Sequence, residues 1–156
     1  MTEAQLRIGV VAERAGVSTR TLRYYEELGL VSPSGYSSGG SRRYVESDLG
    51  RVLRIRELQS VMGFDLDEIG DILGAEDRLA ELQQEYHRGV SAKRRAAILI
   101  EVATLNARTQ EKVLAKIAVL QGFEAELDAK AARYVEFAEE HDIPLPPELR
   151  GTPATR

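Results

Sequence analysis

Residues 16–29 read Gly16-Val17-Ser18-Thr19-Arg20-Thr21-Leu22-Arg23-Tyr24-Tyr25-Glu26-Glu27-Leu28-Gly29. Ser18 is a good N-cap for a helix that begins at Thr19, because its hydroxyl can accept a backbone N–H of the first turn. Gly29 is placed to stop that helix, and Gly16 suits the left-handed position that ends the helix before it. Two short helices joined by a tight turn that contains glycine are the helix-turn-helix pattern.

The apolar residues of both helices repeat at helical spacing. The first helix presents Ile8, Val11 and Ala12. In the second helix, one stripe is expected to be buried: Leu22, Tyr25 and Leu28. Three side chains fall largely off that stripe: Arg20, Arg23 and Tyr24. Of the two adjacent tyrosines, Tyr25 is therefore expected to be the more buried, with its hydroxyl hydrogen-bonded.

Residues 31–44 are rich in turn-forming residues and show no helical pattern. They contain Pro33, three glycines and five serines, which mark turns. This segment could be a flexible linker. However, Arg42-Arg43-Tyr44-Val45 follows directly and has the character of a strand. A short hairpin with serine and glycine at its tip fits better, and it would form a wing beside the second helix.

Two further helices are expected after the wing. The first opens at Glu46 or Ser47 and is broken at Gly63. Its apolar side is predicted to consist of Leu49, Val52, Leu53, Ile55 and Met62. The second is short, is capped by Asp65 and ends at Gly74.

The net charge of −4 is unusual for a protein that binds DNA, but charge distribution matters more than the total. Between residues 18 and 56, seven arginines stand against four carboxylates, a local charge of +3, so the rest of the chain carries −7. Every basic residue in this window is arginine, which suits bidentate contacts to phosphate and guanine. Two interpretations are equally supported for Arg51, Arg54 and Arg56. These side chains can contact DNA, or they can simply solvate the surface of a helix.

The order of these residues resembles that of the MerR family of bacterial regulators. The positions that carry the resemblance are Ile8-Gly9-Val10-Val11-Ala12, Gly16-Val17-Ser18, Thr21 to Leu30, Gly39-Gly40, Arg42, Tyr44, Asp48-Leu49, and Met62-Gly63-Phe64 through Glu68-Ile69. They cover roughly the first 73 residues. The Arg23-Tyr24-Tyr25-Glu26 core with Gly29-Leu30 is specific. The resemblance implies a mainly α fold, in which a winged helix-turn-helix DNA-binding domain precedes a helical connector and a long dimerisation helix in an antiparallel coiled coil.

The resemblance also implies roles for individual residues. Thr19 and Arg20 would approach base edges, since the N-terminal part of a recognition helix enters the major groove. Arg23 and Tyr25 would contact the backbone or bases, while the wing would bind phosphates. The full set of expected DNA-binding residues is Ser18, Thr19, Arg20, Arg23, Tyr24, Tyr25, Arg42, Arg43 and Tyr44.

Two features depart from the family pattern. Many members have tyrosine where this chain has Ser41, so one wing contact is lost or taken over by Arg43. The third helix also has about one residue more than usual before Gly63, so no family contact is carried over to residues 51–60.

The second half contains one long helix. Ser91 caps it, and no proline intervenes before Pro144. An apolar stripe recurs along it at steps of three and four, and the expected dimerisation residues are Val113, Ile117, Leu120, Phe123, Leu127, Ala131 and Tyr134. In the family the stripe packs on the same helix of a second subunit; the alternative is that it folds back on its own domain.

Four segments are therefore predicted. They are a DNA-binding domain (1–74), a helical connector or effector region (75–104), a dimerisation helix (105–141) and a proline-rich, extended or disordered tail (142–156).

Composition excludes most other functions. The chain has no cysteine and only two histidines, far apart, so no metal site, cofactor or catalytic constellation is expected. No apolar run approaches membrane-spanning length and no signal peptide is recognisable, which leads us to expect a cytoplasmic protein.

The sequence thus predicts a non-enzymatic transcription regulator that binds and distorts a pseudo-palindromic promoter as a homodimer, with RNA polymerase as a further partner and an unknown effector. Two alternatives are an architectural or phage-type DNA-binding protein and a helical adaptor that binds protein. The arginine-rich window argues against the adaptor.

Overall fold

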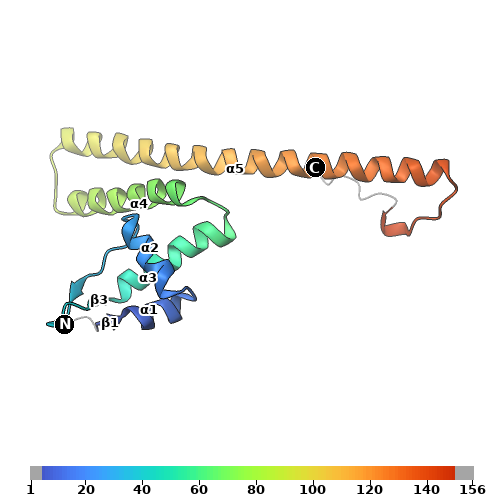
Figure 1. The fold of residues 1–156 in the computed structure, drawn as a ribbon. Coiled ribbons are helices and arrows are strands. Elements are labelled where there is room, and N and C mark those ends of the chain that lie inside the picture. Colours follow the sequence, from blue (N-terminus) through green and yellow to red (C-terminus); the bar gives the residue numbers. More distant parts are fainter. Residues whose placement is uncertain (1–4, 150–156) are drawn as a thin grey trace. The chain divides into compact units, whose positions relative to one another are not determined.

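A computed structural model describes residues 5–149, which divide between two compact units, 1–106 and 107–156. Figure 1 shows the elements, which in chain order are β1 (Leu6–Arg7), α1 (Ile8–Ala15), α2 (Thr19–Glu27), β2 (Gly35–Tyr36), β3 (Arg42–Tyr44), α3 (Glu46–Arg56), a π-helical turn η1 (Glu57–Val61), α4 (Leu66–His87), α5 (Ala92–Glu140) and a 3-10 turn η2 (Pro147–Leu149). The fold is mainly helical, with a small sheet and a long C-terminal helix, as predicted.

The predicted helix-turn-helix is present. Gly16 has φ +63°, and its left-handed backbone lets the Val17 N–H donate to the Ala12 carbonyl at 2.9 Å. The Ser18 hydroxyl accepts from the Thr21 N–H at 2.9 Å and starts α2. At the other end, Gly29 has φ +70° and lies just beyond the C-cap. Local chemistry therefore sets both ends of α2.

The wing is part of a three-stranded antiparallel sheet in the order β1-β3-β2. Gly35 pairs with Arg43 across the predicted hairpin, and Leu6 pairs with Tyr44 on the other side of β3. We did not predict β1, because a two-residue strand has no periodicity of its own. It attaches the wing to the residues immediately before α1.

The third helix differs from the prediction on its outer face. Leu49, Val52 and Ile55 are buried, whereas Leu53 and Met62 are exposed, so the predicted apolar side was too wide. The helix continues into the π-helical turn η1, where the Met62 N–H donates to the Glu57 carbonyl five residues earlier. A π turn accommodates an additional residue without ending the helix.

The prediction of a short fourth helix ending at Gly74 was wrong. Asp65 caps α4 with a reciprocal bond to Glu68, as expected, but the helix continues through Gly74 to His87. A glycine inside a helix costs only about 1 kcal/mol relative to alanine. Tertiary packing on both sides of Gly74 outweighs that cost, since Leu73 and Leu82 are buried.

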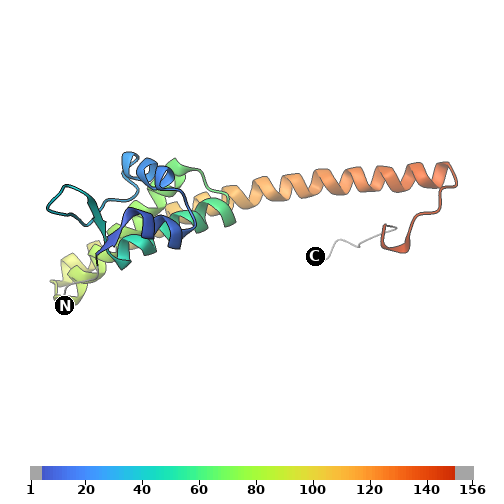
Figure 2. The same cartoon turned by 60° about the horizontal axis from the view of Figure 1, so that its bottom comes forward.

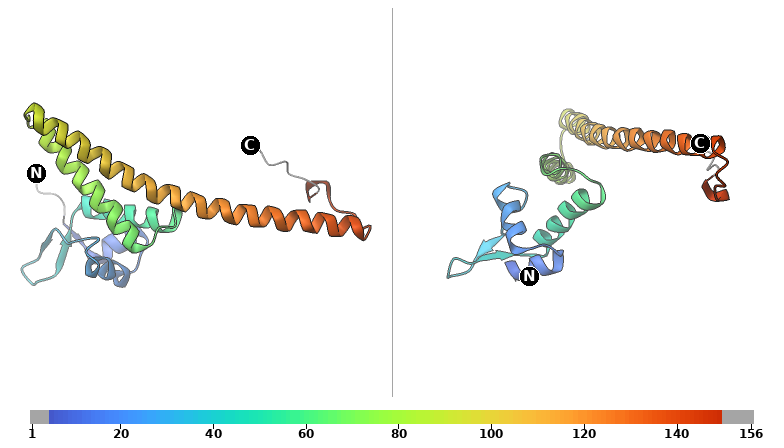
Figure 3. Two further views of the ribbon diagram at one scale, coloured as in Figure 1. Left: turned by 90° about the horizontal axis from the view of Figure 1, so that it is seen from above. Right: turned by 45° about the vertical axis from the view of Figure 1, so that its right-hand side comes forward.

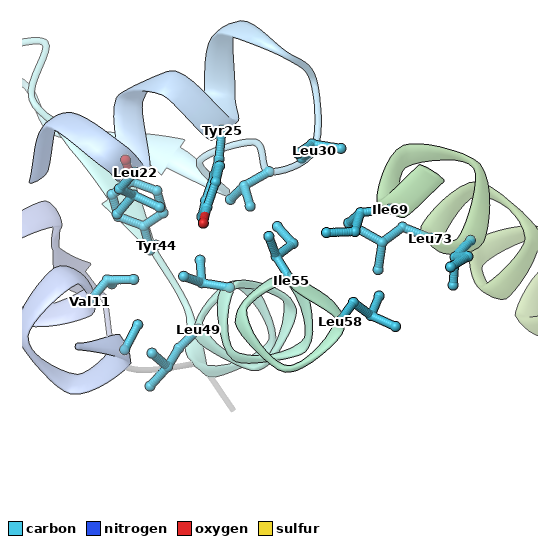
Figure 4. Packing of buried hydrophobic residues seen from close by; sticks show 14 of the residues in the cluster. Val11, Leu22, Tyr25, Leu30, Tyr44, Leu49, Ile55, Leu58, Ile69 and Leu73 are labelled. Atoms are coloured by element: carbon cyan, nitrogen blue, oxygen red, sulfur yellow. The ribbon is translucent and has the colours of Figure 1, made fainter. Parts of the chain in front are cut away.

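The core of the first unit joins α1, α2, β3, α3 and the start of α4 (Figure 4). Its largest fully buried side chains include Leu22, Tyr44, Ile55, Leu58 and Ile69. Burying an aliphatic side chain of this size contributes about 1.5–3 kcal/mol. The core therefore holds the recognition helix and the wing on one scaffold.

The last long helix, α5, begins after Ser91, whose hydroxyl accepts from the Arg94 N–H at 3.2 Å. Its first turns run antiparallel beside α4 (Figures 1 and 3), where Ile98 and Leu82 are buried. Beyond residue 106 the helix belongs to the second unit and can be followed without interruption to Glu140 (Figure 2). Within the predicted tail, Pro147–Leu149 forms η2, and residues 150–156 lie outside the described range. Residues 1–4, where a signal peptide would begin, also lie outside that range.

Candidate nucleic-acid interface

The exposed face of α2 carries four of the predicted contact residues. Thr19, Arg20, Arg23 and Tyr24 are exposed and line one shallow hollow together with Glu27. Within residues 5–149, no carboxylate pairs with Arg20 or Arg23. The start of this helix thus offers open guanidinium, hydroxyl and phenol groups that can donate hydrogen bonds.

Ser18 has a structural task at the same end of the helix. Its Oγ lies 2.8 Å from the Thr21 Oγ1 and also accepts the backbone N–H of Thr21. The side chain is exposed, but its acceptor already serves the N-cap. Any contact to DNA from this position therefore competes with helix capping.

A second, basic hollow lies between α2 and the wing. It is lined by four arginines and three small or apolar residues: Arg7, Arg23, Arg42, Arg43, Ile8, Gly40 and Ser41. These arginines come from β1, α2 and β3, and the pairing of Arg7 with Arg43 brings two of them onto neighbouring strands. Convergent guanidinium groups are suited to phosphate oxygens.

Arg7 belongs to this cluster, but sequence reasoning did not select it. It lies on β1, the strand that the sequence did not predict, so the linear sequence did not indicate that Arg7 lies close to Arg43. A basic residue directly before the first helix was the available signal, and it is a weak one.

Glu26 forms an ion pair with Arg42. The Arg42 Nε lies 2.7 Å from the Glu26 Oε2, and the Glu26 side chain is only 9% exposed. Glu26 also accepts the Tyr44 hydroxyl through its other oxygen. A single carboxylate on α2 thereby positions two residues of β3.

Two predicted DNA-binding residues are buried in the core instead of lying at the surface. Tyr25 is 3% exposed and donates its hydroxyl to the Gln59 Oε1 at 3.0 Å, as expected for the more buried of the two tyrosines. Tyr44 is fully buried. Burial raises the pKa of both hydroxyls, and for Tyr44 the bond to Glu26 raises it further. Leu28, predicted to share the buried stripe, is 43% exposed.

Arg51, Arg54 and Arg56, for which the sequence left two interpretations, all bond to other groups of the protein. Arg51 pairs with Asp77 at 2.7 Å and Arg54 with Glu76 at 2.7 Å, which links α3 to α4. Arg56 donates to the Ala15 carbonyl at the end of α1. These side chains connect helices around the core.

All seven predicted dimerisation residues are exposed in the second unit. They are Val113, Ile117, Leu120, Phe123, Leu127, Ala131 and Tyr134. Leu120 is 61% exposed and Phe123 56%. An apolar stripe of this length is unfavourable in water, because each exposed side chain forgoes its burial energy.

The inventory of other sites is short. In the described part of the chain, no three His, Cys, Asp or Glu side chains are arranged to hold a metal ion. None of the helices between residues 5 and 149 has the length and apolar character needed to cross a membrane.

Comparisons with known proteins agree with this geometry. A family model described as MerR HTH family regulatory protein matches residues 6–76. The mercuric resistance operon regulatory protein of Pseudomonas fluorescens is 37% identical over 75% of this chain and 88% of that protein.

Two solved structures resemble the fold. One is a Listeria monocytogenes protein assigned to the MerR family, with 26% identity and a TM-score of 0.57 over 87% of this chain and 92% of that one. The other is HiNmlR, a MerR family regulator lacking the sensor domain, bound to promoter DNA. It has 26% identity and a TM-score of 0.50 over 88% of this chain and 94% of that one.

Proposed function

The chain belongs to the MerR family of helix-turn-helix regulatory proteins, and from this premise we propose that it binds a pseudo-palindromic promoter site as a homodimer and distorts the DNA there. The family consists of DNA-binding transcription regulators, so the chain is a regulator and not an enzyme. The observation that carries the finer proposal is the open arginine surface shared by α2 and the wing.

In this proposal the N-terminal part of α2 enters the major groove. Thr19 and Arg20 lie on its first turn and are exposed, which suits contact with base edges. Arginine recognises guanine through two parallel hydrogen bonds. Arg20 is thus the residue we expect to contribute most to sequence preference, and Tyr24 supplies a phenol hydroxyl for the backbone.

The basic hollow holds the flanking phosphates. Arg23, Arg42 and Arg43 from the predicted set are joined by Arg7. We assign Tyr25 and Tyr44 an indirect role, since buried hydroxyls bonded to Gln59 and Glu26 position the recognition helix and the wing from within. The local positive charge also explains how a chain with net charge −4 can approach DNA.

Dimerisation follows from the exposed stripe on α5. One recognition helix reads a half-site, and two half-sites require two copies at a fixed spacing. An antiparallel pair of α5 helices would cover the stripe from Val113 to Tyr134 in both copies. We further propose that the dimer bends or untwists its site, so that RNA polymerase can engage the promoter.

The name of the mercury-resistance relative does not identify the effector of this chain. Soft metals are typically held by thiolates, and the chain contains no cysteine. We therefore do not extend a response to mercury to this protein.

The proposal is tested by selecting genomic fragments with the full-length protein and footprinting those recovered. We expect protection of two inverted half-sites whose centres lie about one helical turn of DNA, or a multiple of it, apart. Energy transfer between dyes at the fragment ends is expected to rise on binding, because the site bends.

The alternatives predict other results. Sequence-independent binding would support an architectural DNA-binding protein. No binding to any duplex at low salt would contradict DNA recognition and support the adaptor.

A further inference from the structure

An apolar groove of about 510 Å³ runs between α4 and the first turns of α5, entirely within the first unit. Leu82 and Ile98 are buried in it, whereas Leu99 is 68% exposed on its rim. Leu79 and Val102 line it further along. Small-molecule sites typically have volumes of about 300–1,000 Å³ and apolar walls with a few polar groups at defined positions.

The polar groups of this groove gather at one end. Tyr86 and Arg95 face each other there, near the turn that connects α4 with α5, and Gln83 lies beside them. The guanidinium carbon of Arg95 is 5.9 Å from the centre of the Tyr86 ring. This cation–π contact holds the positive charge of Arg95 beside the Tyr86 ring.

Arg95 differs from its neighbours in having no acidic partner. Arg94 makes two hydrogen bonds to Glu85, at 2.6 and 2.7 Å, and Arg78 bonds to Glu81 and Glu101. No carboxylate among residues 5–149 lies within ion-pair distance of Arg95. The groove therefore has a spare cation at one end and apolar walls along its length.

We propose that this groove binds a small carboxylate with an apolar body. The carboxylate would pair with Arg95, and the body would lie along Leu82 and Ile98 toward Leu79. Leu79 and Tyr86 are seven residues apart on one helix, roughly 10 Å, which suits a hydrocarbon chain of medium length. A bare inorganic anion would leave the apolar walls in water.

The groove is suitably placed to regulate the proposed function, and this part of the inference depends on that function. α4 contributes Ile69 and Leu73 to the core beneath the recognition helix, while α5 continues into the helix that carries Leu120. A ligand that contacts α4 and α5 together favours their packed arrangement by its differential affinity for it.

The test uses the full-length protein and sodium decanoate below its micelle threshold, with 1-decanol as the uncharged probe. Calorimetry is expected to show saturable binding of one decanoate per chain, and much weaker binding of decanol. Arg95→Ala is expected to weaken decanoate binding about 10- to 100-fold, the range for a lost hydrogen bond to a charged group. Lys93→Ala, which removes an exposed cation outside the groove, is the matched control and should change little.

Leu99→Asp provides a second variant, because the exposed rim tolerates a polar residue and the new charge repels an anion. Equal loss of binding in Arg95→Ala and Lys93→Ala, or no decanoate binding at all, would overturn the proposal. If sedimentation showed that the Leu99→Asp variant is a monomer, the proposal would also be overturned, because a second copy of the chain would then cover the groove. Affinity for the selected promoter fragment, measured on the same samples, reports separately on the proposed function.

Discussion

Tyr24 and Tyr25 are neighbours with the same side chain, but their environments differ. Tyr24 is half exposed on the outer face of α2, whereas Tyr25 is packed in the core and bonded to Gln59. The 100° turn between consecutive helical residues separates them. At the scale of single residues, the candidate interface is therefore a choice among chemically suitable side chains, made by the direction in which each one points.

The arginines of the interface are expected to divide into two groups. Arg7→Ala and Arg23→Ala should weaken binding to every duplex and lower the slope of log K against log salt by about one unit for each lost phosphate contact. Arg20→Ala should instead relax sequence preference and cost about 1–3 kcal/mol on the preferred site. Salt titrations on specific and random duplexes measure both effects.

Arg54→Ala serves as the matched control, because Arg54 is bonded to Glu57 and Glu76. It should leave the salt slope unchanged. If the Arg7 and Arg23 variants kept the wild-type slope as well, the phosphate assignment would be wrong.

Arg42 differs from the other interface arginines, because its removal leaves the nearly buried Glu26 without its cation. Arg42→Ala is therefore expected to weaken DNA binding by more than one phosphate contact would explain. The double variant Arg42→Ala/Glu26→Gln should recover the excess, since it also removes the uncompensated charge near the phosphates. Equal affinities for the single and double variants would show that Glu26 has no such effect.

At the scale of elements, the turn between α1 and α2 depends on Gly16. A left-handed backbone costs roughly 1–2 kcal/mol for a residue with a Cβ. An added Cβ would also lie 2.8 Å from Arg56 Nη1, which is engaged with the Ala15 carbonyl. Gly16→Ala should therefore lower the free energy of unfolding by at least this amount, as measured by urea denaturation.

Gly50→Ala is the matched control for that substitution. Gly50 lies inside α3, and a Cβ there meets nothing within 4 Å. Alanine should raise stability by about 0.5–1 kcal/mol, through its better helix propensity. Similar destabilisation by both substitutions would contradict the assigned role of the turn.

The contact between α4 and α5 predicts a pH dependence. Hydrogen bonds from Arg94 and Arg78 lower the pKa of Glu85 and Glu101, respectively, below the ordinary value of 4.5. A carboxylate with a lowered pKa in the folded state stabilises the fold above its ordinary pKa, and this contribution disappears as pH falls through the lowered value. Glu85→Gln should therefore be less stable than wild type at pH 7, and the gap should close below pH 4.5. A gap that persists at low pH would contradict this pairing.

At the scale of the whole molecule, the long exposed stripe of α5 is the feature that calls for a second copy. Burying an aspartate in such a seam without a partner costs about 1–3 kcal/mol or more, and each substitution acts twice in a symmetric dimer. Leu120→Asp or Leu127→Asp should therefore give monomers that keep a folded DNA-binding unit and lose most affinity for the full site. Sedimentation and binding to full and half sites measure the two effects.

Leu114→Asp provides the control, because Leu114 is exposed but lies off the spacing of the stripe. It should remain dimeric. If the Leu120 and Leu127 variants also stayed dimeric with wild-type affinity, the interface would lie elsewhere in the chain.

The sequence by itself determined the local elements of this protein. Ser18, Gly16 and Asp65 act on backbone groups a few residues away, so the end of α1 and the starts of α2 and α4 were predictable from short-range chemistry. Helical spacing likewise predicted that Leu22 is buried. The absence of proline between Ser91 and Pro144 predicted the long helix.

Only the tertiary structure decided what depends on distant neighbours. Helix α4 does not end at Gly74, because packing on either side of this glycine outweighs its weak helix propensity. Tyr44 is buried beneath Glu26, and Arg7 joins the wing through a two-residue strand. These outcomes rest on contacts between segments far apart in the chain, and side-chain periodicity carries no information about which segment will supply the partner.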